Sequence, residues 1–160
     1  MNHEILLGPN QDLPAAPGSY ALLLWISGPG RVPAGRLGAL AVAAGWYLYL
    51  GSALGPGGLA ARCRHHLGLA ARPHWHLDYL RPLGHVAEIW VRPGPERWEH
   101  AWADLLAGWP GATRPFPGFG ASDCRCLSHL VRFPERPDFA RFQRQAGPEP
   151  VRRWIPPRPA

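Results

Sequence analysis

Lysine is absent from this 160-residue sequence, so all 17 basic residues are arginines, set against 11 acidic residues. The formal net charge is +6 at pH 7, and the pI calculated from the sequence is about 10.0. An arginine guanidinium binds phosphate through two parallel N–H donors and stacks on bases, which a lysine ammonium cannot do. The composition therefore favours an anionic partner such as nucleic acid, although a basic surface kept for solubility would give the same charge.

Cysteine and long apolar runs are also scarce. The three cysteines are Cys63, Cys124 and Cys126, and the first twenty residues lack the apolar stretch of a secretory leader. The longest apolar runs, near 21–26 and 37–44, are too short to span a bilayer. We therefore expect no membrane partner and a cytoplasmic, reducing location, where disulfides are rare.

The length suits one domain with a core that needs neither disulfides nor metal. Hydrophobic residues make up 46% of the chain and include eight tryptophans, while 19 glycines and 20 prolines indicate many turns. We expect an extended leader over residues 1–17, a folded domain over 18–146 and a mobile tail rich in proline and arginine over 147–160.

Apolar periodicity predicts the secondary structure. Strands are expected at 19–26, 36–42, 46–50, 86–91 and 127–133, and helices at 59–69, 75–80 and 96–109. Alternation along the third strand puts Tyr47 and Tyr49 on one face, and Trp46 on the other. The pattern predicts an α/β fold in which helices flank a small central antiparallel or mixed sheet.

Polar side chains suited to phosphate chemistry are concentrated in the middle of the chain. Arg62 and His66 are four positions apart, so they share one face of the helix predicted at 59–69. Glu99 shares a helix face with Trp102, so it should border the buried stripe. Hydrolysis of a phosphodiester needs a base, a cation for the phosphoryl oxygens and help for the leaving oxygen, and these residue types supply them.

Several short strings carry a family resemblance. The tripeptide GSY at 18–20 opens an apolar run, YLG at 49–51 closes a second one, and an arginine and a histidine follow on a helix. This order resembles the GIY-YIG nuclease superfamily. The strings YLYLGSA at 47–53, HWHLDYL at 74–80 and FGASDCRCLSHL at 119–130 resemble a branch of it that is described as a domain of unknown function and is sometimes fused to endonuclease III. The likeness spans about residues 18–133.

The resemblance implies a metal-dependent endonuclease that hydrolyses structured or damaged DNA in preference to RNA. Tyr20 and Tyr49 would flank the scissile phosphate, and Arg62 would bind its oxygens. A free tyrosine, with a pKa of about 10, is a poor base at neutral pH. It would need a partner, which could be Arg62, a metal or a neutral histidine.

The histidines would complete the chemistry. By the same resemblance, His66, with His74 or His76, would assist proton transfer. Asp78 could orient one of these histidines, or it could form only the local hydrogen bonds of a helical turn. Contacts with nucleic acid are expected from Tyr47, Ser52, Arg64, His65 and His74.

The resemblance also implies a divalent metal, magnesium or manganese, held by the single carboxylate of Glu99. The alternative is an ordinary boundary carboxylate paired with an arginine. Cys124, Cys126 and His129 could form a soft-metal site with Cys63. A one-residue gap between cysteines is unusual for structural zinc, so thiols that pack a turn are the preferred interpretation and zinc is not expected.

The chain also departs from the superfamily pattern. Tyr20 and Tyr49 are 29 positions apart, wider than in compact members, and no asparagine follows Glu99. Any late polar role would then fall to Ser122 or Ser128. Two alternatives to the nuclease remain open: a nucleic-acid-binding module that does not cleave, and a zinc-stabilised interaction protein.

Overall fold

The computed structural model describes residues 6–7, 13–68, 71–121 and 127–157. The strands are β1 (Leu6–Leu7), β2 (Gly18–Ile26), β3 (Gly30–Pro33), β4 (Ala39–Val42), β5 (Gly45–Ala53), β6 (His85–Pro93), β7 (Leu130–Phe133) and β8 (Arg152–Trp154). The α-helices are α1 (Gly58–Leu67), α2 (His76–Leu80), α3 (Glu99–Ala107) and α4 (Phe139–Gln145), and short 3-10 helices cover Gly35–Leu37 and Arg81–Leu83.

One sheet organises the fold. Its strand order is β1-β8-β6-β2-β5-β7, and β2 pairs antiparallel with β5 along its whole length and with β6 around one irregularity. The short β1 runs parallel to β8, so the sheet is mixed. The predicted α/β fold, with a small central sheet and flanking helices, is confirmed.

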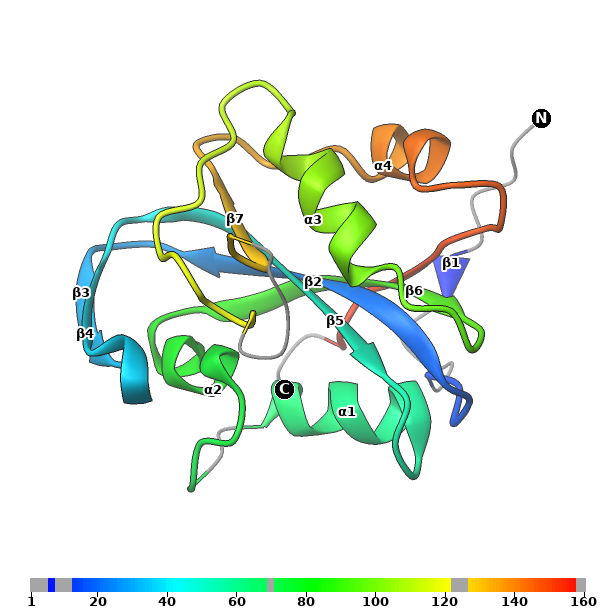
Figure 1. The fold of residues 1–160 in the computed structure, drawn as a ribbon, viewed down its shortest axis with the longest axis horizontal. Helices are drawn as coiled ribbons and strands as arrows, with labels where there is room; N and C mark the ends of the chain where they lie inside the picture. The colour runs from blue at the N-terminus through cyan, green and yellow to red at the C-terminus, as the bar shows by residue number, and fades with distance from the viewer. Residues whose placement is uncertain (1–5, 8–12, 69–70, 122–126, 158–160) are drawn as a thin grey trace.

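Helices cover both faces of the sheet. Helices α1 and α2 lie on one face, and α3 and α4 lie on the other (Figure 1). Successive β2 side chains alternate between the two resulting cores, since Tyr20 and Leu22 pack on the α1 side and Ala21 and Leu23 on the α3 side. A strand buried on both faces reads as a continuous apolar run, which is why 19–26 is recognisable in the sequence.

The strand predicted at 36–42 is wrong in extent and partner. Residues Gly35–Leu37 form a 3-10 turn, and β4 then pairs with β3 in a separate two-stranded sheet. Gly35 and Gly38 have φ angles of 55° and 78°, a left-handed backbone that interrupts a strand. The helix predicted at 96–109 is also shorter, because α3 begins at Glu99 and ends at Ala107.

Described segments on each side of the central domain pack against it. The carbonyls of Pro14 and Ala16 accept hydrogen bonds from the first turn of α1. Within the stretch expected to be mobile, residues 152–154 instead form β8 beside β6, and Val151 and Trp154 are buried. In the ranges that the structure describes, no helix combines the length and the apolar character that crossing a membrane requires.

Candidate active site

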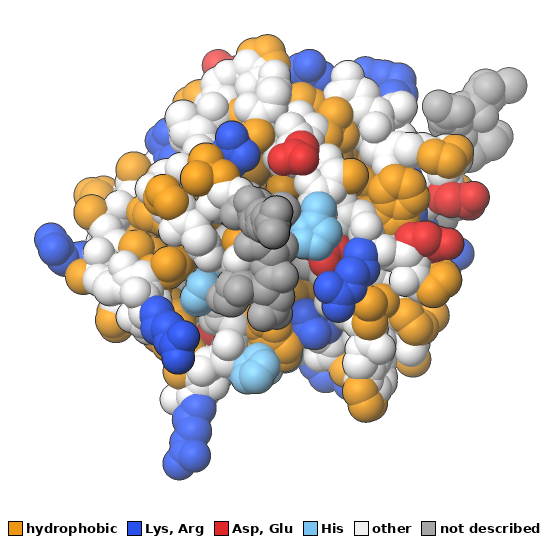
Figure 2. Space-filling view, viewed as in Figure 1, with side chains coloured by type: hydrophobic (Ala, Val, Ile, Leu, Met, Phe, Trp, Pro, Cys, Tyr) orange, Lys and Arg blue, Asp and Glu red, His pale blue; other side chains and the backbone are white. Residues whose placement is uncertain are grey.

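A polar pocket lies beyond the end of the pairing between β5 and β7. The pairing of β7 with β5 runs from Trp46 to Tyr49 and stops there, and the pocket of about 190 Å³ follows. It is lined by Tyr49, Leu50, Gly51, Ser52, Arg62, Trp75, Arg97, Glu99, Gly120 and His129. At this edge, groups from both faces of the sheet can meet, and histidine, arginine and acidic side chains gather near the centre of this face (Figure 2).

Arg62 supplies the cationic side of the pocket. It projects from α1, with its guanidinium carbon 4.1 Å from the centre of the Trp75 ring and its Nη1 donating to the Ser52 carbonyl at 3.3 Å. Stacking on an indole and one backbone hydrogen bond fix the plane of the guanidinium. The guanidinium lines the pocket, and its fork of N–H donors has the geometry that suits a phosphate.

Glu99 supplies the acidic side, from the first turn of α3 on the opposite face of the sheet. Its carboxylate is buried, accepts a hydrogen bond from the Ser52 hydroxyl, and lies 3.9 Å from Arg97 and 3.6 Å from His100. Ser19 anchors this helix to β2, because its hydroxyl accepts from the backbone N–H of Trp98 at 2.9 Å. The carboxylate is thus held at the pocket wall and does not project into bulk solvent.

Tyr20 lies directly behind the pocket. Its side chain is fully buried, and its hydroxyl is 2.8 Å from Nε2 of His66, which is itself fully buried on α1. Burial raises the Tyr20 pKa well above its usual value; Tyr49 adds to this and Arg62 opposes it. Burial also lowers the pKa of His66, against the opposing effect of Asp78. Both groups are therefore neutral near pH 7.

Two glycines make room for the tyrosine rings. Gly51 stands opposite Tyr20 in the β2–β5 ladder, and a Cβ there would lie 2.5 Å from the Tyr20 hydroxyl. Gly120, with φ at 69°, passes close to Tyr49, where a Cβ would lie 2.9 Å from the ring. Burial raises the pKa of Tyr49 as well, and nearby Arg62 opposes the rise. Tyr49 is thus a neutral phenol in the pocket wall.

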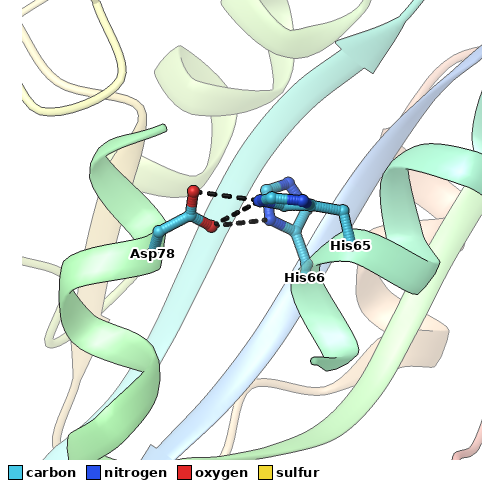
Figure 3. A group of neighbouring side chains, drawn as sticks. All are labelled: His65, His66 and Asp78. Atoms are coloured by element: carbon cyan, nitrogen blue, oxygen red, sulfur yellow. Dashed lines mark hydrogen bonds and ion pairs between the residues drawn. The ribbon is translucent and has the colours of Figure 1, made fainter. Parts of the chain in front are cut away.

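Asp78 joins α2 to α1 through two histidines. Its carboxylate contacts Nε2 of His65 at 3.0 Å and faces Nδ1 of His66 at 3.6 Å, with both rings turned toward it (Figure 3). It also accepts the backbone N–H groups of His74 and Trp75 at 2.8 and 3.0 Å. Burial by itself would raise the Asp78 pKa, but these donors outweigh it and lower the pKa far below the usual value. Asp78 therefore remains a carboxylate.

The two histidines and Asp78 also have the composition of a metal site. Their donor atoms lie within 4.8 Å of one another, and no other such group occurs in the described ranges. Three hydrogen-bond donors already occupy the carboxylate, so we describe the group as a hydrogen-bonded cluster. Asp78 makes the local hydrogen bonds of the helical turn, and it also binds His65 on α1.

The remaining predicted site residues fall outside the pocket lining. His76 accepts a hydrogen bond from the Gly120 N–H at 2.7 Å, and so ties α2 to that loop. His74 and Arg64 are exposed on the α1 side, and the His74 ring meets the Trp75 ring edge to face, with the ring centres 4.2 Å apart. His65, expected to contact nucleic acid, is hydrogen-bonded to Asp78, and its side chain is 32% exposed.

The role predicted for Tyr47 is wrong. It was expected to contact nucleic acid, but its ring is fully buried and its hydroxyl donates to the Ala43 carbonyl at 2.6 Å. Cys124 and Cys126 lie outside the described residues. Cys63 is buried on α1 with a free thiol, and burial raises its pKa to about 12. His129 lies in the pocket wall.

Two side chains of the pocket lining, those of Trp75 and Arg97, had no predicted role. Trp75 lies in the string HWHLDYL, and Arg97 stands two positions before Glu99. The signal available for Trp75 was general: a tryptophan is the best cation–π partner for an arginine such as Arg62. Arg97 had no comparable signal.

Comparison with known families identifies the chain. The family described as "Domain of unknown function DUF123" matches residues 19–149, which run from the second residue of β2 through α4 and include every pocket residue. The chain therefore belongs to this family. Parallel searches of curated proteins and of solved structures gave no match.

Proposed function

We propose that this chain is a metal-dependent endonuclease related to the GIY-YIG superfamily, hydrolysing phosphodiester bonds in structured or damaged DNA. The observation that carries the proposal is the convergence of Tyr49, Arg62 and Glu99 on one small polar pocket, with Tyr20 directly behind it. These residues come from separate strands and helices on both faces of the sheet. Packing alone does not require a phenol, a guanidinium and a carboxylate at one place.

Each group has a role that its surroundings support. The oriented guanidinium of Arg62 would bind the phosphate oxygens and stabilise the charge that grows on them. Tyr49 would contact the phosphate from the wall of the pocket, and Tyr20 would act through its hydrogen bond to His66. A pocket of about 190 Å³ is small, which favours one phosphate group over a whole nucleotide.

A divalent metal fits the donor set. Glu99 offers one buried carboxylate at the pocket wall, and Ser52 offers a hydroxyl beside it. Magnesium and manganese are bound in this way, with few protein oxygens, several waters and the substrate phosphate. When bound, the metal would polarise the phosphoryl group and neutralise charge on the leaving oxygen. The neighbouring Arg97 and His100 would have to turn away from the carboxylate, which their partial exposure allows.

The test is cleavage of a labelled panel of plain, flapped, branched and abasic duplexes with magnesium or manganese. We expect cutting that EDTA abolishes and that falls by about 10²–10⁴-fold in Glu99→Gln and in Tyr20→Phe. Glu96→Gln and Tyr79→Phe are matched controls, because Glu96 is an exposed carboxylate and Tyr79 a tyrosine on α2, both outside the pocket lining.

Binding measured on the same panel separates the alternatives. Retained binding with lost cutting in both variants would support the nuclease. Salt-sensitive binding that is indifferent to metal and to Glu99→Gln, with no cutting of any substrate, would refute it in favour of a binding module.

A further inference from the structure

We propose that Asp78 is a positioning residue that fixes the His66 imidazole as the acceptor of the Tyr20 hydroxyl proton. The inference rests on the proposed endonuclease function and names the group that activates water within it. It joins a carboxylate on α2, an imidazole on α1 and a phenol on β2 into one chain, which ends directly behind Gly51 of the pocket wall.

The tautomer of His66 follows from its two neighbours. Nδ1 is buried, has no hydrogen-bond partner among the described residues, and faces the Asp78 carboxylate at 3.6 Å. A lone pair pointed at a carboxylate would be repelled, whereas an N–H is attracted, so Nδ1 carries the proton. Nε2 then holds the lone pair, and the Tyr20 hydroxyl at 2.8 Å donates to it.

Several hydrogen bonds hold the Asp78 carboxylate in this position. One of its oxygens accepts from the backbone N–H groups of His74 and Trp75, and His65 binds from the side. Because these donors come from the turn that starts α2, the carboxylate is held toward α1 before any substrate binds. The fully buried His66 lacks the freedom to turn elsewhere.

The Tyr20 phenol relays a proton and is not ionised before the reaction. Its raised pKa keeps a tyrosinate rare at neutral pH. In the proposed step, a water oxygen bonds to phosphorus and gives its proton to the Tyr20 oxygen, while the Tyr20 proton moves to His66 Nε2. The bond from phosphorus to the leaving oxygen breaks, and that oxygen takes a proton from solvent. Tyr20 ends neutral, and Asp78 stabilises the imidazolium, as the third group of a catalytic triad does.

The charged and titratable groups around His66 define its pH dependence. They are Asp78 on α2, Arg62 and His65 on α1, Tyr20 on β2, Tyr49 on β5, and Arg81, whose Nε donates to the His66 carbonyl at 2.5 Å. Asp78 raises the His66 pKa, while burial, Arg62 and His65 lower it. Loss of the carboxylate should therefore lower this pKa further.

The first arm of the test needs no substrate. Protein labelled with ¹⁵N-histidine is studied by two-dimensional NMR at a pH where His66 is neutral, with the His66 signals assigned from their absence in His66→Gln. We expect a protonated Nδ1 and a pyridine-like Nε2, and a switch to protonated Nε2 in Asp78→Asn, whose amide would donate to Nδ1. A protonated Nε2 in the native protein overturns the proposal, whether or not the protein cuts DNA.

The second arm measures the pH profile of single-turnover cleavage on the duplex that is cut best. Activity requires neutral His66, so it rises with pH through the His66 pKa. In Asp78→Asn we expect a plateau lower by about 10²–10⁴-fold and an acid limb moved to lower pH. A lower plateau with an unmoved limb means that Asp78 only supports the fold, and overturns the proposal. Asp138→Asn, an exposed helix cap on α4, is the matched control and should change neither. If no duplex is cut, the proposed function fails, and the NMR arm still decides the tautomer.

Discussion

Gly51→Ala is the sharpest test of how the tyrosine behind the pocket is packed. The backbone of Gly51 is compatible with alanine, since its φ lies outside the left-handed region, so only the added methyl matters. That methyl would lie 2.5 Å from the Tyr20 hydroxyl and 2.6 Å from the ring carbon that bears it. Tyr20 is fully buried and is hydrogen-bonded to His66 of α1, so it cannot move aside without breaking that contact.

The expected loss of stability in Gly51→Ala has two contributions. Overpacking a well-packed core by one methyl destabilises by about 1–3 kcal/mol. Separating the Tyr20 hydroxyl from His66 leaves buried polar groups unsatisfied, for about 1–3 kcal/mol more. We therefore expect the free energy of unfolding to fall by about 2–6 kcal/mol. With a urea m-value of about 2 kcal/mol/M, the unfolding midpoint should drop by about 1–3 M.

The assay is urea unfolding followed by tryptophan fluorescence and by circular dichroism. Gly55→Ala is the matched control, because Gly55 is exposed and a Cβ there would meet nothing within 4 Å. Its unfolding free energy should change by less than about 1 kcal/mol. Equal midpoints for the two variants would refute the close approach of Gly51 and Tyr20, and with it the reason for a glycine at this position.

Two further predictions concern stability away from the pocket. Buried Glu88 accepts hydrogen bonds from Trp90, Arg136 and Arg153; burial by itself would raise its pKa, but these donors lower it. The contribution of ionised Glu88 to stability is therefore complete above its unfolded-state pKa of about 4.3 and is lost as pH falls through the lower folded-state pKa. In Glu88→Gln, the free energy of unfolding measured with urea should thus fall less steeply between roughly pH 5 and 2 than in the native protein. An unchanged slope of unfolding free energy against pH would contradict this. Trp154→Ala should cost about 3–5 kcal/mol in the same assay, because Trp154 is buried in the core, whereas the exposed Ile155→Ala should cost little; similar small losses in both would mean that β8 contributes nothing.

The long central strands could be predicted because their burial leaves a direct signature in the sequence. In β2 every side chain but one is buried, and turn residues bound the run on both sides. The segment 36–42 offered an apolar pattern of the same kind, but the pattern does not reveal which strand will pair with it. Left-handed backbone at Gly35 and Gly38 decided the outcome, since it turns the chain back on β3.

The site shows the same division between local pattern and tertiary contact. The helical spacing of Arg62 and His66 placed both on α1, and the alternation that put Tyr47 beside Tyr49 on one face was also correct. Yet Tyr47 ends near the Ala43 carbonyl while Tyr49 reaches the pocket, although both residues pair with β7, so the difference depends on the tertiary surroundings of each ring. The meeting of His66 with Asp78 likewise depends on how closely α2 approaches α1. Spacing within one element cannot report either distance.

The first three residues of β2 make their contacts alternately on the two faces of the sheet. Gly18 lets Leu59 of α1 pack closely, Ser19 bonds to the backbone before α3, and Tyr20 turns back to the α1 side. A slip of β2 by one residue against β5 would exchange these faces, sending the phenol toward α3 and the hydroxyl toward α1. Such a chain could keep a paired sheet and yet lack any working centre. Correct strand register is thus a separate requirement from compact folding, and two equally compact species would differ in whether the pocket residues come together.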